Sequence, residues 1–306
     1  MSWLFFSIAT ALLWGTAELF YKKGAQPGEK YSHLKICVCV GAVMGLHAIF
    51  TLLTQDINYD PINLLVYLPV SLLYIISMAF SYFGMRFLEE SISDPIENTS
   101  GAICSLLCVI FLKESLTPLS VIAILVIVIG VLGVGFLENK GDTIRKKRLG
   151  TKLAIVAFCM PFVYALLDAF GSFVDIFYLD DFASTPLIGV TEDTIEDVAN
   201  TSYELTFALF ALGLFIFMKA KKVKFGPIPQ HKDKILAAVF ETAGQFTYVY
   251  ALSGNGAIAA PIISSVCIVS LLLSRIFLKE KLSWKTYVFI AIVIIGILLL
   301  AVSEEL

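Results

Sequence analysis

The sequence predicts an all-α membrane protein whose ten transmembrane helices form two inverted five-helix repeats around a central cavity. Three observations predict it: composition, a series of apolar segments, and an internal repeat. Hydrophobic residues make up 58% of the 306 residues, and charged residues only 15%. Average soluble domains carry roughly 25% charged residues. The composition therefore excludes an ordinary soluble domain.

Apolar segments of about 20 residues recur along the chain, and each is long enough to cross a hydrocarbon core about 30 Å thick. Backbone polar groups in lipid need partners within the protein, so these segments are expected to be helices. We expect the helices at about residues 2–21, 31–53, 63–86, 91–112, 118–137, 152–178, 202–218, 235–253, 257–277 and 285–303.

The internal repeat is clearest in the string Phe-Leu-Lys-Glu, which occurs at Phe111–Glu114 and again, 166 residues later, at Phe277–Glu280. Nearer the N-terminus the offset is 150, and Glu18 of the first copy corresponds to Asp168 of the second. Each copy holds five spans. Because five is odd, the second copy enters the membrane upside down, an architecture found in secondary transporters.

The two copies set the expected organisation: a first repeat at 1–137, a basic linker at 138–151, and a second repeat at 152–306 with an acidic loop at 179–200. If successive loops lie on alternate sides of the membrane, one side holds the acidic loop and both termini. Only Lys113 of the 22 Lys and Arg residues falls on that side. The positive-inside rule makes the basic side cytoplasmic. Both termini are then expected outside the cytoplasmic membrane, and anionic lipid rather than nucleic acid explains the basic runs.

Several segments resemble the drug/metabolite transporter superfamily of the EamA type. They are Leu13-Trp14-Gly15, the small and polar stretch Ser91–Gly101, and Phe-Leu-Lys-Glu-Ser-Leu from Phe111; Ala257–Ser265 and Phe-Leu-Lys-Glu-Lys-Leu from Phe277 repeat the pattern. The resemblance implies a five-plus-five inverted bundle that transports small metabolites by alternating access. Such proteins usually have both termini in the cytoplasm, whereas the charge distribution here places them outside.

Four carboxylates are expected inside the membrane: Glu18, Glu97, Asp168 and Glu241. Ionisable groups at this depth are costly and are functional candidates by default. A desolvated carboxylate tends to hold its proton near neutral pH and can exchange the proton for a cation. This chemistry suits proton-coupled transport or the binding of an organic cation. The alternative is that the four acids only form hydrogen bonds between helices.

Polar and aromatic residues on the same helix faces predict a lined cavity, because residues four and seven apart share a face. Aromatic rings beside acids suit a cation, which the ring face attracts. The candidates for substrate binding or coupling, besides the four acids, are Trp14, Tyr164, Gln245, Tyr248, Asn98, Ser81 and Ser264.

Pro95 and Pro261 occupy matching positions in the two copies and predict interrupted helices with hinges beside the binding site. His47 is expected to form an interhelical hydrogen bond. The six cysteines all lie within predicted spans, so neither a disulfide nor a metal site is expected. No cofactor is expected.

The predicted function is secondary active transport of a small metabolite or of an organic cation or amine. The transport is expected to be coupled to protons and to proceed by alternating access. A neutral polar solute such as a sugar, moved with protons, is the alternative substrate. A phosphate ester is disfavoured because no Lys or Arg lies deep in the membrane. An intramembrane enzyme or receptor is less consistent with the sequence, which lacks His-Glu-x-x-His, Gly-x-Ser-x-Gly and ATP-binding loop motifs.

Overall fold

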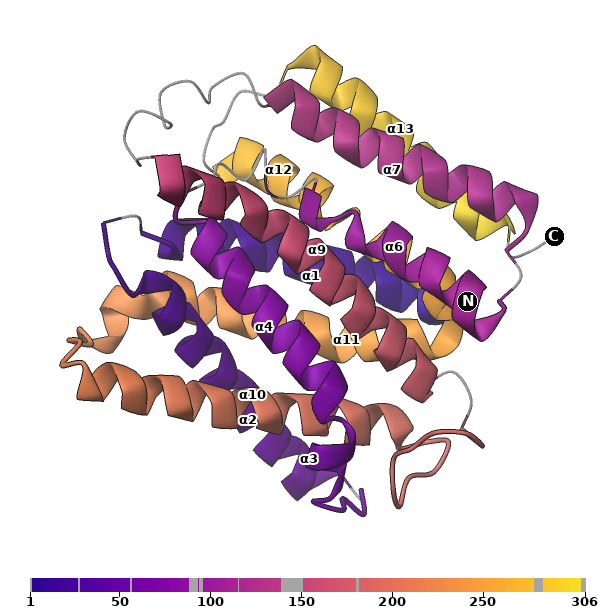
Figure 1. Ribbon diagram of the computed structural model, residues 1–306. Helices are drawn as coiled ribbons and strands as arrows, with labels where there is room; N and C mark the ends of the chain where they lie inside the picture. The colour runs from indigo at the N-terminus through magenta and orange to yellow at the C-terminus, as the bar shows by residue number, and fades with distance from the viewer. Residues whose placement is uncertain are drawn as a thin grey trace.

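The computed structural model describes residues 2–26, 28–55, 57–87, 93, 96–114, 116–138, 151–179, 182–277 and 283–303. Within these residues the regular structure is helical throughout (Figure 1). Of the basic linker predicted at 138–151, only the two end residues are among the described residues. Pro95, one of the two predicted hinges, lies outside them.

The first half begins with two long helices, α1 (Ser2–Gly24) and α2 (Ser32–Thr54). The predicted third span is divided at Tyr67 into α3 (Asn63–Val66) and α4 (Leu68–Gly84). α6 (Ser100–Leu107) continues into a π-helical turn, η1 (Cys108–Leu112), and α7 (Pro118–Glu138) follows.

The second half begins with α9 (Thr151–Leu179) and α10 (Ile195–Ala220), after which a short η3 (Ile228–His231) leads into α11 (Lys232–Ile263). α11 has a kink at Asn255, where φ is −166° and ψ is 78°, between the predicted eighth and ninth spans. α12 (Val266–Phe277) and α13 (Trp284–Ser303) complete the described helices.

α10 begins at Ile195, inside the acidic loop expected at 179–200 and before the span expected to start at residue 202. The backbone N–H of Thr191 donates to the Thr194 hydroxyl at 2.8 Å just before the helix. Glu196 and Asp197 occupy the first turn, where the helix dipole favours negative charge. These features start the helix before the apolar run that the sequence analysis used.

Within the part of the chain that the structure describes, five helical segments are long and apolar enough to cross a membrane: Ser2–Gly24, Ser32–Thr54, Ile155–Leu179, Ile195–Ala220 and Ile228–Ile263. Shorter apolar helices fall within the other predicted spans. Outward-facing side chains are also apolar, as in Phe5, Leu46 and Leu53, which are 69%, 69% and 80% exposed. Such a surface is rare in water and is expected in contact with lipid.

Each long helix packs against a helix of the other half (Figure 1). α1 lies along α11, α2 along α10, α4 along α9, and α7 along α13. Figure 1 also shows that α1 begins and α13 ends at the same end of the bundle. The main apolar core lies among α1, α2, α4, α10 and α11, while a second core joins α7, α12 and α13.

The α7–α13 contact depends on two glycines, Gly130 and Gly296. A methyl group at Gly130 would lie 2.3 Å from Val293 Cγ2 and 3.2 Å from the Phe289 carbonyl oxygen. A methyl group at Gly296 would lie 2.7 Å from Ile127 Cγ1 and 3.2 Å from the carbonyl oxygen of Ala123. Small residues let membrane helices approach closely, and here they do so on both sides of the contact.

Gly296→Ala is expected to force α7 and α13 apart and to lower the free energy of unfolding by roughly 1–3 kcal/mol, as overpacking does. Gly213→Ala in α10 is the matched control, because a methyl group there would meet nothing within 4 Å. Thermal melting in detergent measures both. Equal melting temperatures for the two variants would contradict the packing argument.

An ion-pair cluster joins the α1–α2 loop to α2 and α11. Glu29 pairs with Lys35, and its carboxylate lies 3.7 Å from Lys234 Nζ. Lys35 and Lys234 are only 6% and 3% exposed, and Lys35 Nζ also donates to the Lys224 carbonyl oxygen at 2.9 Å. Two buried lysines therefore depend on one carboxylate.

Burial by itself would raise the pKa of the Glu29 carboxyl, but the hydrogen bond from Lys35 and the nearby charges of Lys234, Lys35 and His231 outweigh it. The pKa of Glu29 therefore lies below its ordinary value of 4.5. A carboxyl whose pKa is lowered by folding stabilises the fold above its unfolded pKa, and this stabilisation is lost as the pH falls through the folded pKa.

Glu29→Gln is accordingly expected to lower the melting temperature at neutral pH and to have a smaller effect below about pH 4. Melting curves of wild type and variant across this range measure the difference. Glu192→Gln, in an exposed loop, is the control. A Glu29→Gln effect that stays constant with pH would show that charge on Glu29 does not matter.

Candidate functional site

A cavity of about 890 Å³, including the part open to the surroundings, lies inside the bundle. Residues from α1, α4, α6, α9, α10, α11 and α12 line it. All eleven residues that the sequence analysis proposed for substrate binding or coupling are among the lining residues: Glu18, Asp168, Glu241, Glu97, Trp14, Tyr164, Gln245, Tyr248, Asn98, Ser81 and Ser264.

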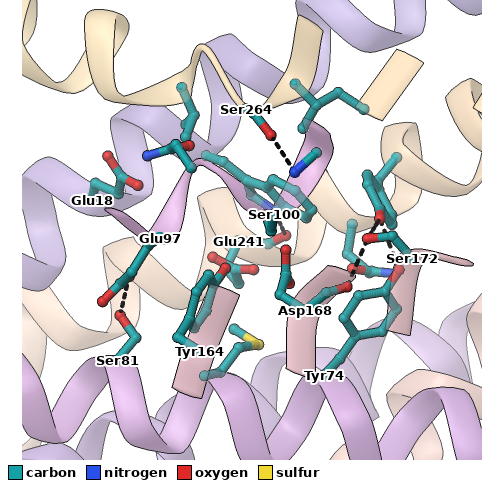
Figure 2. Close-up of a pocket in the computed structure, with 18 of the residues that line it drawn as sticks. Glu18, Tyr74, Ser81, Glu97, Ser100, Tyr164, Asp168, Ser172, Glu241 and Ser264 are labelled. Carbon is teal, nitrogen blue, oxygen red and sulfur yellow. Dashed lines mark hydrogen bonds between the residues drawn. The ribbon is translucent and has the colours of Figure 1, made fainter. Parts of the chain in front are cut away.

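The four predicted carboxylates reach the cavity from four different segments. Glu18 lies on α1, Asp168 on α9 and Glu241 on α11, while Glu97 precedes α6. Figure 2 shows Glu241 and Asp168 near the middle of the view, with Glu18 and Glu97 at one side. The fold therefore gathers acids that are far apart in the sequence around one space.

Glu241 is held by aromatic side chains of α1 and α4. Tyr82 donates a hydrogen bond to the Tyr21 hydroxyl at 2.8 Å, and Tyr21 donates to Glu241 Oε2 at 3.3 Å. The Trp14 indole N–H donates to the Glu241 backbone carbonyl at 3.2 Å. Glu241 is 7% exposed. These donors fix the carboxylate in place and leave its charge without a cationic partner among them.

Hydroxyl groups also surround Glu97 and Asp168. Ser81 donates to Glu97 Oε2 at 2.8 Å (Figure 2). The hydroxyl groups of Ser100 and Tyr164 lie near the Asp168 carboxylate. Ser100 is the first residue of α6, so Asp168 also lies near the positive end of that helix dipole. The contacts named here with both acids come from neutral groups.

Aromatic rings form much of the remaining wall. The rings of Trp14 and Tyr248 lie 4.9 Å apart, and those of Tyr21 and Tyr82 lie 4.7 Å apart. Tyr74 packs edge-on to Tyr203 at 5.9 Å. None of the lining residues that the structure describes is Lys, Arg or His. The cavity is therefore acidic and aromatic.

The cavity also adjoins two breaks in helices. Turns at Asn98–Thr99 and Ser264–Ser265 precede α6 and α12, and the two breaks are 166 residues apart, the offset of the repeat. The Gly101 backbone N–H donates to Ser264 Oγ at 3.0 Å (Figure 2). The interruptions thus meet at the cavity, as paired interruptions in inverted-repeat transporters do.

The second break lies at Ser264–Ser265, three residues after Pro261, where the sequence analysis predicted a hinge. The helix continues through Pro261 and ends at Ile263. Proline has no N–H to donate to the carbonyl four residues earlier, which is that of Ala257. The Ser105 hydroxyl of α6 donates to that carbonyl instead. The carbonyl oxygen that Pro261 leaves without a helical donor therefore accepts a hydrogen bond from α6, and the backbone turns three residues later, at Ser264.

The EamA-like transporter family matches residues 1–136 and 183–302, most of the chain. The chain belongs to this family. A solved structure whose title gives only "Crystal structure of protein" is similar in fold, with a TM-score of 0.72 and 14% sequence identity over 99% of this chain and 98% of that chain. No curated protein shows significant sequence similarity.

Membership in the EamA-like family identifies an integral membrane protein and a transporter of the drug/metabolite type, which acts on a small molecule. The first matched region covers the first sequence repeat, and the second covers the part of the second repeat from residue 183. The resemblance stated from the motifs is therefore confirmed.

Two buried acids of this EamA-like protein were not among the candidates. Asp175 is 0% exposed and lies seven residues after Asp168, on the same face of α9. Glu204 on α10 is also 0% exposed. Glu204 was missed because it stands at the predicted start of a span, where an acid is usually solvated. The spacing from Asp168 was the available signal for Asp175.

Glu204 accounts for His47, which was expected to bond between helices. His47 Nδ1 lies 2.8 Å and 2.9 Å from the two carboxylate oxygens of Glu204, linking α2 to α10. Neither residue lines the cavity. The expectation for His47 is confirmed.

Proposed function

We propose that this EamA-like protein is a secondary active transporter of a small organic cation or amine, coupled to protons, in the cytoplasmic membrane. One observation carries the proposal: four carboxylates, six tyrosines and one tryptophan line a single cavity, and its described lining residues include no basic side chain. Ring faces attract a cation, and the carboxylates neutralise it.

The same acids suggest how protons would couple to the cation. An ionised carboxylate away from water is costly, so an empty cavity favours protonated acids. An entering cation favours the ionised form and displaces protons. Because proton and cation compete for the same carboxylates, a pH gradient drives the cation in the opposite direction to the protons. No catalytic step is required, and we propose that the protein is not an enzyme.

For alternating access we propose ten spans arranged as two inverted repeats, 1–137 and 152–306. Three features support this arrangement. In the repeat, α1 corresponds to α9, α2 to α10, α4 to α11 and α7 to α13. The contact between α1 and α11 therefore corresponds to the contact between α9 and α4, and the α2–α10 and α7–α13 contacts each join corresponding helices. The helix breaks are one repeat apart. Gly130 and Gly296 make reciprocal contacts, since Val293 and Ile127 are themselves one repeat apart.

The proposed orientation places the basic end in the cytoplasm and both termini outside. Its support is the charge distribution of the sequence and the position of the α1 start and α13 end at one end of the bundle. A reporter fused after Leu306 tests it, and a reporter that behaves as cytoplasmic would reverse the orientation.

A neutral polar solute such as a sugar is the second candidate, since Asn98, Gln245, Ser81 and Ser264 offer hydrogen bonds in the same cavity. In that case the acids would serve only the protons. The charge of the ligand separates the two candidates, because an acidic aromatic cavity discriminates by charge and hydrogen-bonding groups discriminate by shape.

A thermal-shift experiment with a panel of tetramethylammonium, tetraethylammonium, choline and tetraphenylphosphonium tests the substrate class. A ligand that binds only the folded state stabilises it by about 2.7 kcal/mol at 100 times its Kd. Tetraphenylborate has the shape of tetraphenylphosphonium with the opposite charge, and glucose represents the neutral candidate. We expect stabilisation by cations alone. Stabilisation by glucose, or by both tetraphenyl ions equally, would reject a cation site.

A further inference from the structure

A chain of buried hydroxyl groups leads out of the cavity to a fifth carboxylate, Asp175. The Ser172 and Tyr248 hydroxyl oxygens lie 2.7 Å apart, and those of Tyr248 and Tyr74 also lie 2.7 Å apart. Tyr74 donates to Asp175 Oδ2 at 3.3 Å, and Tyr67 donates to Asp175 Oδ1. Ser172, Tyr248 and Tyr74 line the cavity, whereas Asp175 does not.

Figure 2 places Ser172 and Tyr74 on the opposite side of the view from Glu18. The hydroxyl chain therefore leaves the cavity beside Asp168 and away from Glu18. Tyr67, the other hydroxyl donor to Asp175, caps the break between α3 and α4. The chain connects the cavity to the end of the bundle that holds α3.

Each hydroxyl group carries one proton, so the chain has two complete arrangements. When Asp175 is ionised, Ser172 donates to Tyr248, Tyr248 donates to Tyr74, and Tyr74 donates to Asp175. When Asp175 is protonated, every bond reverses, and the Ser172 proton turns to the Asp168 carbonyl oxygen, which lies 2.9 Å away. Both arrangements fit the same heavy-atom positions.

Among the residues that the structure describes, the titratable groups that face Asp175 are acids or phenols. Tyr67 and Tyr74 donate to it from the α3–α4 region. Tyr203 on α10 and Tyr248 on α11 interact with its charge, and Asp168 lies two turns earlier on the same helix. None of these five groups becomes a cation on protonation, so none of them neutralises an ionised Asp175, whereas a proton on Asp175 does.

We propose that Asp175 is a second proton-binding site, whose protonation state reaches the cavity through reversal of the Ser172–Tyr248–Tyr74 hydroxyl chain. In the transfer step a proton from the cavity binds the Ser172 oxygen, and each hydroxyl passes its own proton onward. Asp175 gains a proton on Oδ2, and no bond between heavy atoms changes. This inference rests on the proposed proton coupling and adds a site outside the cavity.

Infrared difference spectra between high and low pH test the proposal on the purified full-length protein without any substrate. We expect one protonated-carboxyl band of the wild type to be lost in Asp175→Asn. We also expect the tyrosine bands that change with it to stay constant in that variant. Tyr74→Phe cuts the chain, so it should remove the tyrosine changes while retaining an Asp175 carboxyl band with a shifted midpoint.

Tyr59→Phe is the control, because the Tyr59 hydroxyl lies 3.0 Å from Ser202 Oγ and Tyr59 neither lines the cavity nor belongs to the chain. It should leave both signals intact. Ser172→Ala, which cuts the chain at the cavity end, serves if Asp175→Asn does not fold. Unchanged carboxyl bands in Asp175→Asn, or unchanged tyrosine bands in Tyr74→Phe or Ser172→Ala, would overturn the proposal. Absence of cation binding would reject the proposed function and leave these spectra unaffected.

Discussion

Simultaneous Glu18→Gln and Asp168→Asn substitutions are expected to abolish pH-driven transport while the protein remains folded. The amides keep the shape of the acids and much of their hydrogen bonding, but they cannot release a proton. An ionised acid inside a low-dielectric cavity costs free energy, so the melting temperature should stay the same or rise. Uptake of the tightest-binding quaternary ammonium ion into proteoliposomes with a pH gradient, expressed per folded molecule, measures the effect.

Glu192→Gln removes an acid from an exposed loop and should transport like the wild type. If Glu18 and Asp168 only hold helices together, the double variant should lose stability first and transport only in proportion. Full pH-driven activity of the double variant would reject both acids as coupling groups.

Glu241→Gln is expected to weaken cation binding by roughly 10- to 100-fold, equivalent to about 1.4–2.8 kcal/mol. Tyr21 fixes the Glu241 carboxylate, and the tilted rings of Trp14 and Tyr248 lie 4.9 Å apart in the cavity wall. Removing the charge takes away the electrostatic part of the site and leaves the ring faces. Titration with tetraphenylphosphonium measures the affinity.

Glu204→Gln is the matched control for Glu241, because Glu204 is a buried glutamate that does not line the cavity. It removes the charge that pairs with His47 and should lower stability without changing cation affinity. Equal losses of affinity in the two variants would mean that the effect comes from the fold rather than from charge in the cavity.

The sequence predicted the helical fold because composition and the repeat act over long segments. A span of about 20 apolar residues has few alternatives to a membrane helix. Local breaks were harder to predict. The division at Tyr67 and the start of α10 at Ile195 depend on turn contacts, which apolar patterning does not reveal.

The cavity residues were predictable for a related reason: each intramembrane acid is costly, so its presence alone marks a candidate. The hinge at Pro261 stays a prediction; the contact of the Ala257 carbonyl with Ser105, a residue of another helix, could not be read from the sequence. Glu204 was missed because its burial comes from packing of α10 against α2, which a helix boundary read from one sequence cannot show. The hydroxyl chain to Asp175 likewise requires three segments to meet.

The number of protons released per cation bound tests the central claim, exchange of protons for a cation at the cavity acids. Calorimetric titration with tetraphenylphosphonium in buffers of different ionisation enthalpy measures this number. We expect a net release near neutral pH that falls in the double variant of Glu18 and Asp168. Cation binding that releases no protons anywhere in the pH range in which the protein is folded would contradict the account.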